Sequence, residues 1–351
     1  MMDMKTFDEV FIDKTKYGIK VQTSEYGEQG DHIIIDQGQS QIAGYTDRED
    51  GLFEEVPAVI FGDHTRVIKY VDEPFFLGAD GIKVLRSKYA NANYKYLYYA
   101  LKNAKIPNVG YNRHFKWLKG IQINYPDYDK QALIVETLDK VSWVISQRKM
   151  ELQLLDDLIK ARFVEMFGLP GTDEKRWGLR PLGECCELNP KKASDRRLTS
   201  GIEVSFIPMT AVSENGAIKT SEKKVYDEVK VGFTYFAEND VLFAKITPCM
   251  ENGKGAVAVG LCNGIGFGST EFHVLRPLAG RSNPYWLYSL TAFDTFRKDA
   301  AANMTGSAGQ RRVPSTFLDK YKVTLPPFEL QNQFADFANQ VDKSKLFAGI
   351  Y

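Results

Sequence analysis

Hydrophobic and polar residues alternate in short runs along most of the chain, and glycine, proline or polar residues separate the runs. Alternation with a period of two predicts half-buried β-strands, whereas a period near 3.6 predicts amphipathic helices. Strand-like runs are followed by tyrosine- and leucine-rich helical segments at 94–98 and again at 285–288. The pattern therefore predicts an α+β fold.

The pattern occurs twice along the chain. Matching segments are 7–9 and 182–184 (weakly), 59–61 and 241–243, 78–86 and 268–276, 93–98 and 283–288, and 118–126 and 318–326. The separation between matching segments only grows along the chain, as insertions into loops of a shared framework would produce. Loop content is what differs between the copies. A common scaffold with variable loops favours recognition, although a duplicated domain can also be purely structural.

A long helix is predicted between the copies, from Asp129 to Phe167, and Gly168 and Pro170 end it. Apolar residues recur with alternating steps of four and three, interrupted by Arg148, which indicates a heptad seam. The seam comprises Ile134, Leu138, Val141, Ile145, Leu152, Leu155, Ile159 and Phe163. Such a helix would be about 58 Å long at 1.5 Å per residue. We interpret it as a stiff spacer that needs a partner helix; an ordinary coiled coil without a measuring role is the alternative.

Composition supports a folded protein without deciding its partner. The chain has 351 residues, enough for two domains, with 44% hydrophobic and 13% aromatic residues. The 45 lysines and arginines equal the 45 aspartates and glutamates in number. A zero net charge argues neither for nor against nucleic acid, because a basic face can be offset by acidic surface elsewhere.

Several classes of protein are disfavoured by the sequence. The four cysteines, Cys185, Cys186, Cys249 and Cys262, form no CxxC pair and lie in no Cys/His cluster, so we expect reduced packing residues and no metal site. No apolar stretch is long enough to span a bilayer, and residues 1–14 lack an apolar signal core. We therefore expect a cytoplasmic protein.

Specific stretches resemble the specificity subunit of type I restriction-modification systems. They are 34–39 with 43–45, 205–209, 240–248, 268–272, and the closing run from 311 to 327. The resemblance covers essentially the whole chain. It implies a pseudo-two-fold internal repeat of two similar target recognition domains, separated by a long α-helical coiled-coil spacer. The implied divisions are 1–128 (first recognition domain), 129–168 (spacer helix), 169–328 (second recognition domain) and 329–351 (C-terminal spacer helix).

The resemblance also implies the function and the partners. Each recognition domain would read one half of a bipartite target in double-stranded DNA, and the helices would dock two methyltransferase subunits. Those subunits, not this chain, would bind S-adenosylmethionine. A translocase-nuclease subunit would complete the restriction complex. The chain itself would catalyse nothing.

One departure from the family concerns the second helix. From Glu329 onward the apolar residues Phe334, Phe337, Ala338 and Val341 repeat the seam, but the helix is shorter than the first. In an antiparallel pair it would leave Ile134, Leu138 and Val141 poorly covered. We therefore expect the isolated protein to be poorly soluble, or to borrow a helix from another copy or from the methyltransferase.

Base reading requires side chains with paired donors or acceptors, namely arginine and lysine for guanine and asparagine and glutamine for adenine. Candidates in the first copy are Gln37, Gln39, Tyr45, His64, Arg66, Asn112, Arg113 and His114. Candidates in the second copy are Lys245, Thr247, Asn252, Lys254, Gln310, Arg311 and Arg312. All lie beside turn-like segments, which favours exposure, and 306–312 is the most favourable loop. Lys191, Lys192, Arg196 and Arg197 form a basic cluster that could touch phosphates or simply face solvent.

Catalytic motifs are absent or incomplete. The glycine-rich segment 264–268 superficially resembles a cofactor loop, and Leu325-Pro326-Pro327-Phe328 resembles an amino-methyltransferase motif. However, Leu325 has no polar group to bind a target amino group, and no Walker A sequence occurs. Besides the specificity subunit, two alternatives stay open: a scaffold that binds no DNA, and an inactive truncated specificity subunit.

Overall fold

The computed structural model describes residues 3–78, 80–108, 110, 112–219, 222–307 and 309–349. Ala79 of the repeated segment, Ala308 of the glycine-rich loop and Tyr351 lie outside the described residues. The chain divides into two compact units, Met1–Ser146 and Gln147–Tyr351.

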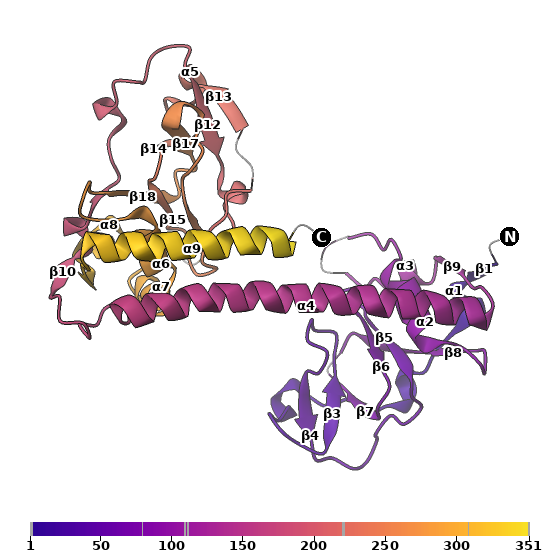
Figure 1. Cartoon of the computed structure of the whole chain (residues 1–351). Coiled ribbons are helices and arrows are strands. Elements are labelled where there is room, and N and C mark those ends of the chain that lie inside the picture. Colours follow the sequence, from indigo (N-terminus) through magenta and orange to yellow (C-terminus); the bar gives the residue numbers. More distant parts are fainter. Residues whose placement is uncertain are drawn as a thin grey trace. The chain divides into compact units, whose positions relative to one another are not determined.

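The described part of the first unit contains three small sheets and three short α-helices, and α4 begins in it (Figure 1). A four-stranded antiparallel sheet has the order β2-β8-β5-β6, a three-stranded sheet the order β4-β3-β7 with β3 parallel to β7, and β1 pairs with β9. The strands are β1 (Met4–Thr6), β2 (Phe11–Asp13), β3 (His32–Ile35), β4 (Gly44–Thr46), β5 (Ala58–Gly62), β6 (Ile68–Val71), β7 (Phe75–Leu77), β8 (Ile82–Ser87) and β9 (Gln122–Asn124). The helices are α1 (Phe7–Val10), α2 (Tyr94–Lys102), α3 (Phe115–Leu118) and the first part of α4 (Tyr128–Phe167).

Strand β5 lies at the centre of the first unit and is buried on both faces. Val59 and Phe61 pack with Leu97 of α2 in one core. Ala58 and Ile60 point to the opposite face, as the period of two requires, and belong to a second core that includes Phe75 and Leu77 of the three-stranded sheet. The helix α2 begins where the Asn93 side chain accepts a hydrogen bond from the amide of Tyr96.

The second unit repeats this topology, with β14 as an additional strand beside β17. Its sheets have the orders β11-β18-β15-β16, β13-β12-β17-β14 with β12 parallel to β17, and β10-β19. The strands are β10 (Leu179–Pro181), β11 (Cys186–Leu188), β12 (Glu203–Ile207), β13 (Glu222–Val225), β14 (Thr234–Ala237), β15 (Val241–Ala244), β16 (Gly255–Val257), β17 (Ile265–Gly268), β18 (Phe272–Pro277) and β19 (Lys322–Thr324). The helices are the end of α4, α5 (Tyr226–Val229), α6 (Pro284–Ala292), α7 (Asp294–Ala302), α8 (Ser315–Lys320) and α9 (Phe328–Gly349).

The two units share individual backbone hydrogen bonds as well as strand order. Lys14 N donates to Val84 O at 2.8 Å, and Asn189 N donates to Val274 O at 2.7 Å at the matching place. The predicted fold class, two similar copies with a long helix between them, is therefore confirmed. Helix α7 is an addition in the second copy, because the described residues that follow α2 in the first copy form no helix before α3, which matches α8.

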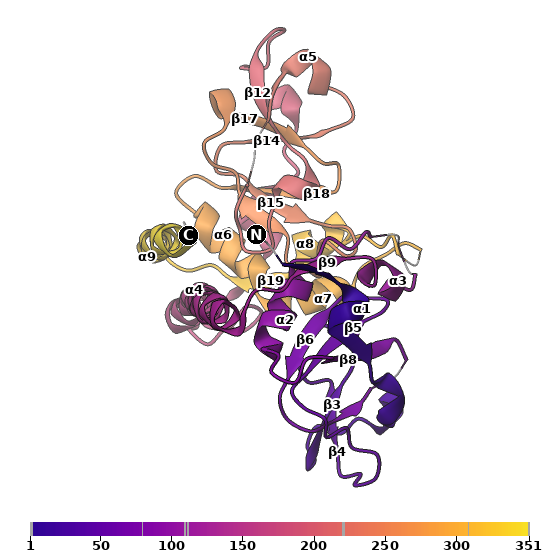
Figure 2. The ribbon, with the colours of Figure 1, turned by 90° about the vertical axis from the view of Figure 1, so that its right-hand side faces the viewer.

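In the second unit, α9 lies antiparallel to the end of α4 (Figures 1 and 2). Phe334 meets Phe163 and Phe167 edge-on, with ring centroids 5.5 and 5.4 Å apart. Further along α9, Lys345 Nζ lies 2.6 Å from Asp156 Oδ1. Residue numbers thus rise along α9 while the numbers of their contact residues on α4 fall, as in an antiparallel pair. The seam residues Leu152, Leu155 and Ile159 are partly buried, and Phe163 is fully buried.

The seam behaves differently in the first unit. The expectation that Ile134 would be poorly covered is wrong, because it packs against the core of the first unit beside the buried Val135. Leu138 is also partly buried. Val141 and Ile145 are each 49% exposed, so the uncovered part of the seam lies closer to the middle of α4 than expected.

Candidate nucleic-acid interface

In each copy, three segments distant in sequence meet through equivalent backbone hydrogen bonds. Asp63 N donates to Gly81 O and His114 N donates to Asp63 O, at 2.6 and 2.8 Å. In the second copy Lys245 N donates to Glu271 O and Val313 N donates to Lys245 O, both at 2.9 Å. We call these places the first junction (63–67, 80–81 and 112–114) and the second junction (245–247, 271 and 310–313). They gather most of the candidate DNA-reading residues.

At the first junction the Gln37 side chain fastens the loops together. Its Nε2 donates to Asp80 O at 2.9 Å, and its Oε1 accepts from the amide of His64 at 3.1 Å. A Cβ at Gly81 would come within 2.6–2.8 Å of this amide, and the φ of Gly81, +94°, favours glycine there. Because both ends of the Gln37 amide bind backbone groups, its role in this structure is to shape the junction.

The expectation that every candidate is exposed is wrong for His114. Its side chain is buried, and Nδ1 lies 3.0 Å from Asp63 O. It packs inward because Asp63 binds this segment twice more, through the amides of His114 and Phe115. The Arg66 side chain also makes a contact within the protein, since its Nη1 donates a hydrogen bond to Ile106 O at 3.4 Å. Asn112 and Arg113 are the exposed candidates at the first junction.

At the second junction Arg312 forms a two-pronged ion pair with Glu271. Nε and Nη2 donate to the two carboxylate oxygens at 2.9 and 2.8 Å, and Nη1 donates to Gln310 O at 3.0 Å. This hydrogen bonding holds the pKa of Glu271 below its ordinary value. Burial lowers the pKa of the neighbouring Lys245, and Arg312 lowers it further, although Glu271 opposes both effects. Glu271 is not among the predicted DNA-reading residues, most of which are cationic or amide side chains.

The second junction continues into the loop between β15 and β16, residues 245–254. Thr247 Oγ1 donates to Glu251 at 2.9 Å, and Lys254 Nζ donates to Met209 O at 3.3 Å. The exposed candidates are Asn252 on this loop and Gln310 and Arg311 beside it. Together they offer amide and guanidinium groups of the kind that bind adenine and guanine edges.

Two candidates lie outside the junctions. Gln39 is exposed in the loop that follows β3. Tyr45 belongs to β4, where its backbone pairs with Ile33 and exchanges hydrogen bonds with Gly27. Base contact by these residues would have to come from the three-stranded sheet.

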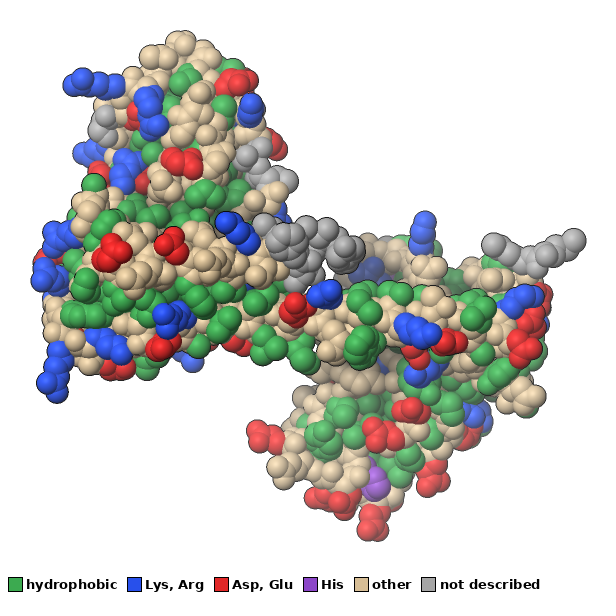
Figure 3. Space-filling view, viewed as in Figure 1, with side chains coloured by type: hydrophobic (Ala, Val, Ile, Leu, Met, Phe, Trp, Pro, Cys, Tyr) green, Lys and Arg blue, Asp and Glu red, His purple; other side chains and the backbone are tan. Residues whose placement is uncertain are grey.

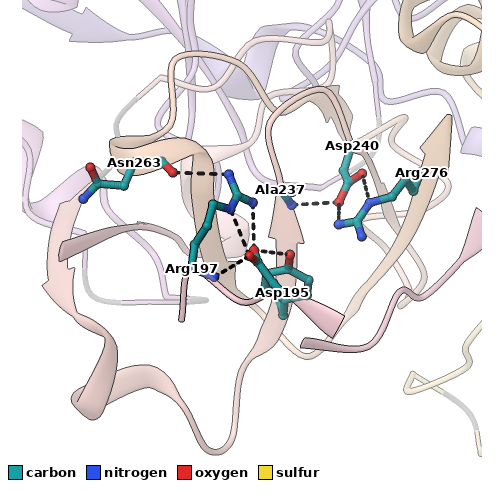
Figure 4. A network of polar contacts seen from close by, with 7 residues as sticks. Asp195, Arg197, Ala237, Asp240, Asn263 and Arg276 are labelled. Atoms are coloured by element: carbon teal, nitrogen blue, oxygen red, sulfur yellow. Dashed lines mark hydrogen bonds and ion pairs between the residues drawn. The ribbon is translucent and has the colours of Figure 1, made fainter. Parts of the chain in front are cut away.

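Part of the basic cluster at residues 191, 192, 196 and 197 makes ion pairs and hydrogen bonds within the protein (Figure 4). Arg197 pairs with Asp195, with Nη2 2.7 Å from Oδ2, and Tyr235 donates to the same carboxylate at 2.7 Å. The hydrogen bond from Arg197 holds the pKa of Asp195 far below its ordinary value. Nearby, Arg276 pairs with the buried Asp240, which also accepts from the amide of Ala237. The hydrogen bond from Tyr235 of β14 to Asp195 holds the segment around residue 195 against the sheet, and Arg196 is exposed.

Other kinds of site find little support in the described residues. Within the described ranges, His, Cys, Asp and Glu side chains form no group of three or more placed to hold a metal ion. Cys185 and Cys186 are buried, and burial raises the pKa of Cys185 to about 11. Every helix in the described part of the chain is too short or too polar to cross a membrane.

Comparison with known proteins agrees with this architecture. Residues 3–154 and 174–349 each match the model of the type I restriction modification DNA specificity domain. The chain is 41% identical over 160 residues to the EcoAI type I restriction enzyme specificity subunit of Escherichia coli, and 39% identical over 154 residues to the EcoEI subunit of the same organism. These alignments cover 45% and 43% of this chain, and only 26% and 25% of the relatives.

A solved structure extends the likeness to the whole chain. The type I restriction-modification S subunit from M. genitalium superposes with a TM-score of 0.54 at 14% identity, covering 99% of this chain and 91% of that one. At this identity the likeness concerns the fold alone. Because the family model matches both copies, the chain belongs to the family of type I restriction modification DNA specificity domains.

Proposed function

We propose that this chain is the specificity subunit of a type I restriction-modification complex and reads a bipartite DNA sequence, one half with each copy. The observation that carries the proposal is the shared junction. Two copies of one fold use the same backbone hydrogen bonds to hold loops whose exposed side chains differ. A common frame with divergent donors suits two readers of different sequences.

The most exposed candidates carry the reading. At the first junction the exposed candidates are Asn112 and Arg113, and at the second junction and its adjoining loop they are Asn252, Gln310 and Arg311. Arg312 and Gln37 act as supports for their neighbours, because their polar groups already bind Glu271 and backbone atoms. Basic residues such as Arg196 contribute phosphate contacts, which add affinity without sequence preference.

The finer part of the proposal concerns the helices. In the second unit, Met150, Leu154 and Leu158 are 57%, 62% and 46% exposed and lie four residues apart along α4. This spacing places them on one face of α4, away from the seam that meets α9. Hydrophobic side chains are visible along this part of α4 in Figure 3. In the first unit Trp143 is likewise 63% exposed. These apolar surfaces suit helices of two methyltransferase subunits, which would bind S-adenosylmethionine and carry out the methylation.

The test combines a genomic measurement with binding. Deletion of the gene should abolish one bipartite methylated motif in the host, and the full chain should restore it. In the assembled methyltransferase, Gln310→Ala with Arg311→Ala should weaken preference for that motif by roughly 1–3 kcal/mol for each base that the variant no longer reads. Arg180→Ala, an exposed change on β10, is the control. A methylome unaffected by deletion would refute the proposal and favour a scaffold or an inactive subunit.

A further inference from the structure

A buried arginine in the second copy lies behind the loop between β15 and β16. Arg297 on α7 is only 6% exposed. Its hydrogen bonds within the described residues go to backbone oxygens, and no carboxylate there pairs with it. Burial lowers its pKa to about 10, so the guanidinium still carries its charge at neutral pH. A buried charge without a counter-ion is costly unless several hydrogen bonds compensate it.

The compensating groups are carbonyl oxygens, and most of them belong to the β15–β16 loop. Nη1 donates to Met250 O at 3.0 Å and to Lys254 O at 3.4 Å, while Nη2 lies 3.4 Å from Gly253 O. Nε donates to Thr291 O at 2.6 Å, which anchors the guanidinium to α6. The centre of the Phe243 ring lies 4.4 Å from it. A planar group with five donors can reach these oxygens at once, and a lysine ammonium cannot.

The loop is built to admit this side chain. A Cβ at Gly255 would lie 2.9 Å from Leu242 O and 3.2 Å from Arg297 Nη2, so glycine allows the close approach. Gly253 adopts φ +85, a left-handed turn that favours glycine. The loop carbonyls thus point inward to Arg297, while the Asn252 side chain is exposed and Lys254 is half-exposed.

In the first copy the corresponding loop is also held by an arginine, but there the arginine belongs to the loop itself. This loop is shorter, from 63 to 67, and Arg66 reaches out of it to Ile106 O with one bond of 3.4 Å. In the second copy the arginine comes from α7 and reaches into the loop. The longer loop is therefore held by several bonds from a helix that has no counterpart in the described part of the first copy.

We propose that Arg297 is a positioning residue for DNA recognition by the second copy: its guanidinium holds the β15–β16 loop in the shape that presents Asn252 to DNA. The inference rests on the proposed function. It adds that α7, through Arg297, determines how well the second copy discriminates between DNA sequences. It also predicts that replacing Arg297 affects only one half of the target.

The first test measures discrimination by the assembled methyltransferase. Arg297→Met should lower the preference for the correct second half-site about tenfold, the effect of one misplaced base-reading side chain, and leave the first half-site unchanged. Phe296→Leu is the matched control, since Phe296 is fully buried on the same helix but contacts Phe243, Phe317 and Tyr321 instead of the loop. Arg297→Lys should restore discrimination only in part.

Hydrogen exchange on the full chain gives a second readout that needs no DNA. Arg297→Met should raise exchange in 245–254 well above the level in Phe296→Leu, with no change in 63–67. The inference is overturned if the two variants behave alike, or if both half-sites lose discrimination equally. The wild-type complex separates this failure from failure of the proposed function. If the wild-type complex shows no bipartite preference, the proposed function is wrong. If it shows the preference and Arg297→Met behaves like the control, only the inference about Arg297 is wrong.

Discussion

The aromatic contact between α4 and α9 gives a prediction whose size can be worked from the structure. Phe334 is fully buried, and its ring meets Phe163 and Phe167 edge-on. Truncating a core phenylalanine to alanine costs about 3–5 kcal/mol, including the cavity left behind. The two ring pairs, worth about 0.5–1.5 kcal/mol each, favour the upper half of that range for Phe334→Ala.

The assay is thermal unfolding, with hydrogen exchange to assign the transition to the second unit. For a unit of this size each kcal/mol moves the Tm by about 2–4 °C, so a shift of at least about 8 °C is expected. Phe337→Ala is the control on the same helix. Phe337 is only partly buried and lies under Arg162, 5.7 Å from its ring, so about 1 kcal/mol is expected. Equal shifts for the two variants, or a Phe334→Ala effect below about 1 kcal/mol, would refute this pairing of the helices.

Three further predictions address charge, pH and assembly. Asp240→Asn should destabilise the second unit by about 3 kcal/mol in urea unfolding, because Arg276 would lose its buried partner. Burial lowers the pKa of His273 in the folded protein. The contribution of the neutral imidazole to stability should therefore be complete above the unfolded-state pKa near 6.5 and fall as the pH drops below that value. His273→Gln should flatten this dependence in unfolding measured between about pH 7 and 5. Leu154→Glu should weaken co-purification of the methyltransferase without lowering the Tm, since Leu154 is 62% exposed; unchanged assembly would exclude this face as the docking surface.

The repeat could be predicted from the sequence because short-range hydrophobic periodicity marks the same strands and helices in both copies. Strand alternation around Val59 and Val241 and the helical periods after each copy survive loop insertions, and they correspond to matched strands and helices in the structure. The heptad seam likewise predicted a long helix, because residues seven apart lie on the same stripe of a helix.

The details of the junctions could not be predicted because they depend on contacts between distant segments. His114 is buried beside Asp63, Arg312 is bound by Glu271, and Arg297 is held by the loop at Met250. Nothing near these residues in sequence marks such partners. The heptad pattern does not predict the second apolar face of α4, which includes the 62% exposed Leu154, because its residues fall outside the seam.

On the proposed function, each copy independently reads half of one DNA target. The most direct measurement replaces residues 1–128 with the matching segment of a related specificity subunit and maps methylated sites across the host genome. We expect one half of the motif to change while the other half and the gap between them are retained. A motif that changes in both halves, or in neither, would contradict the claim.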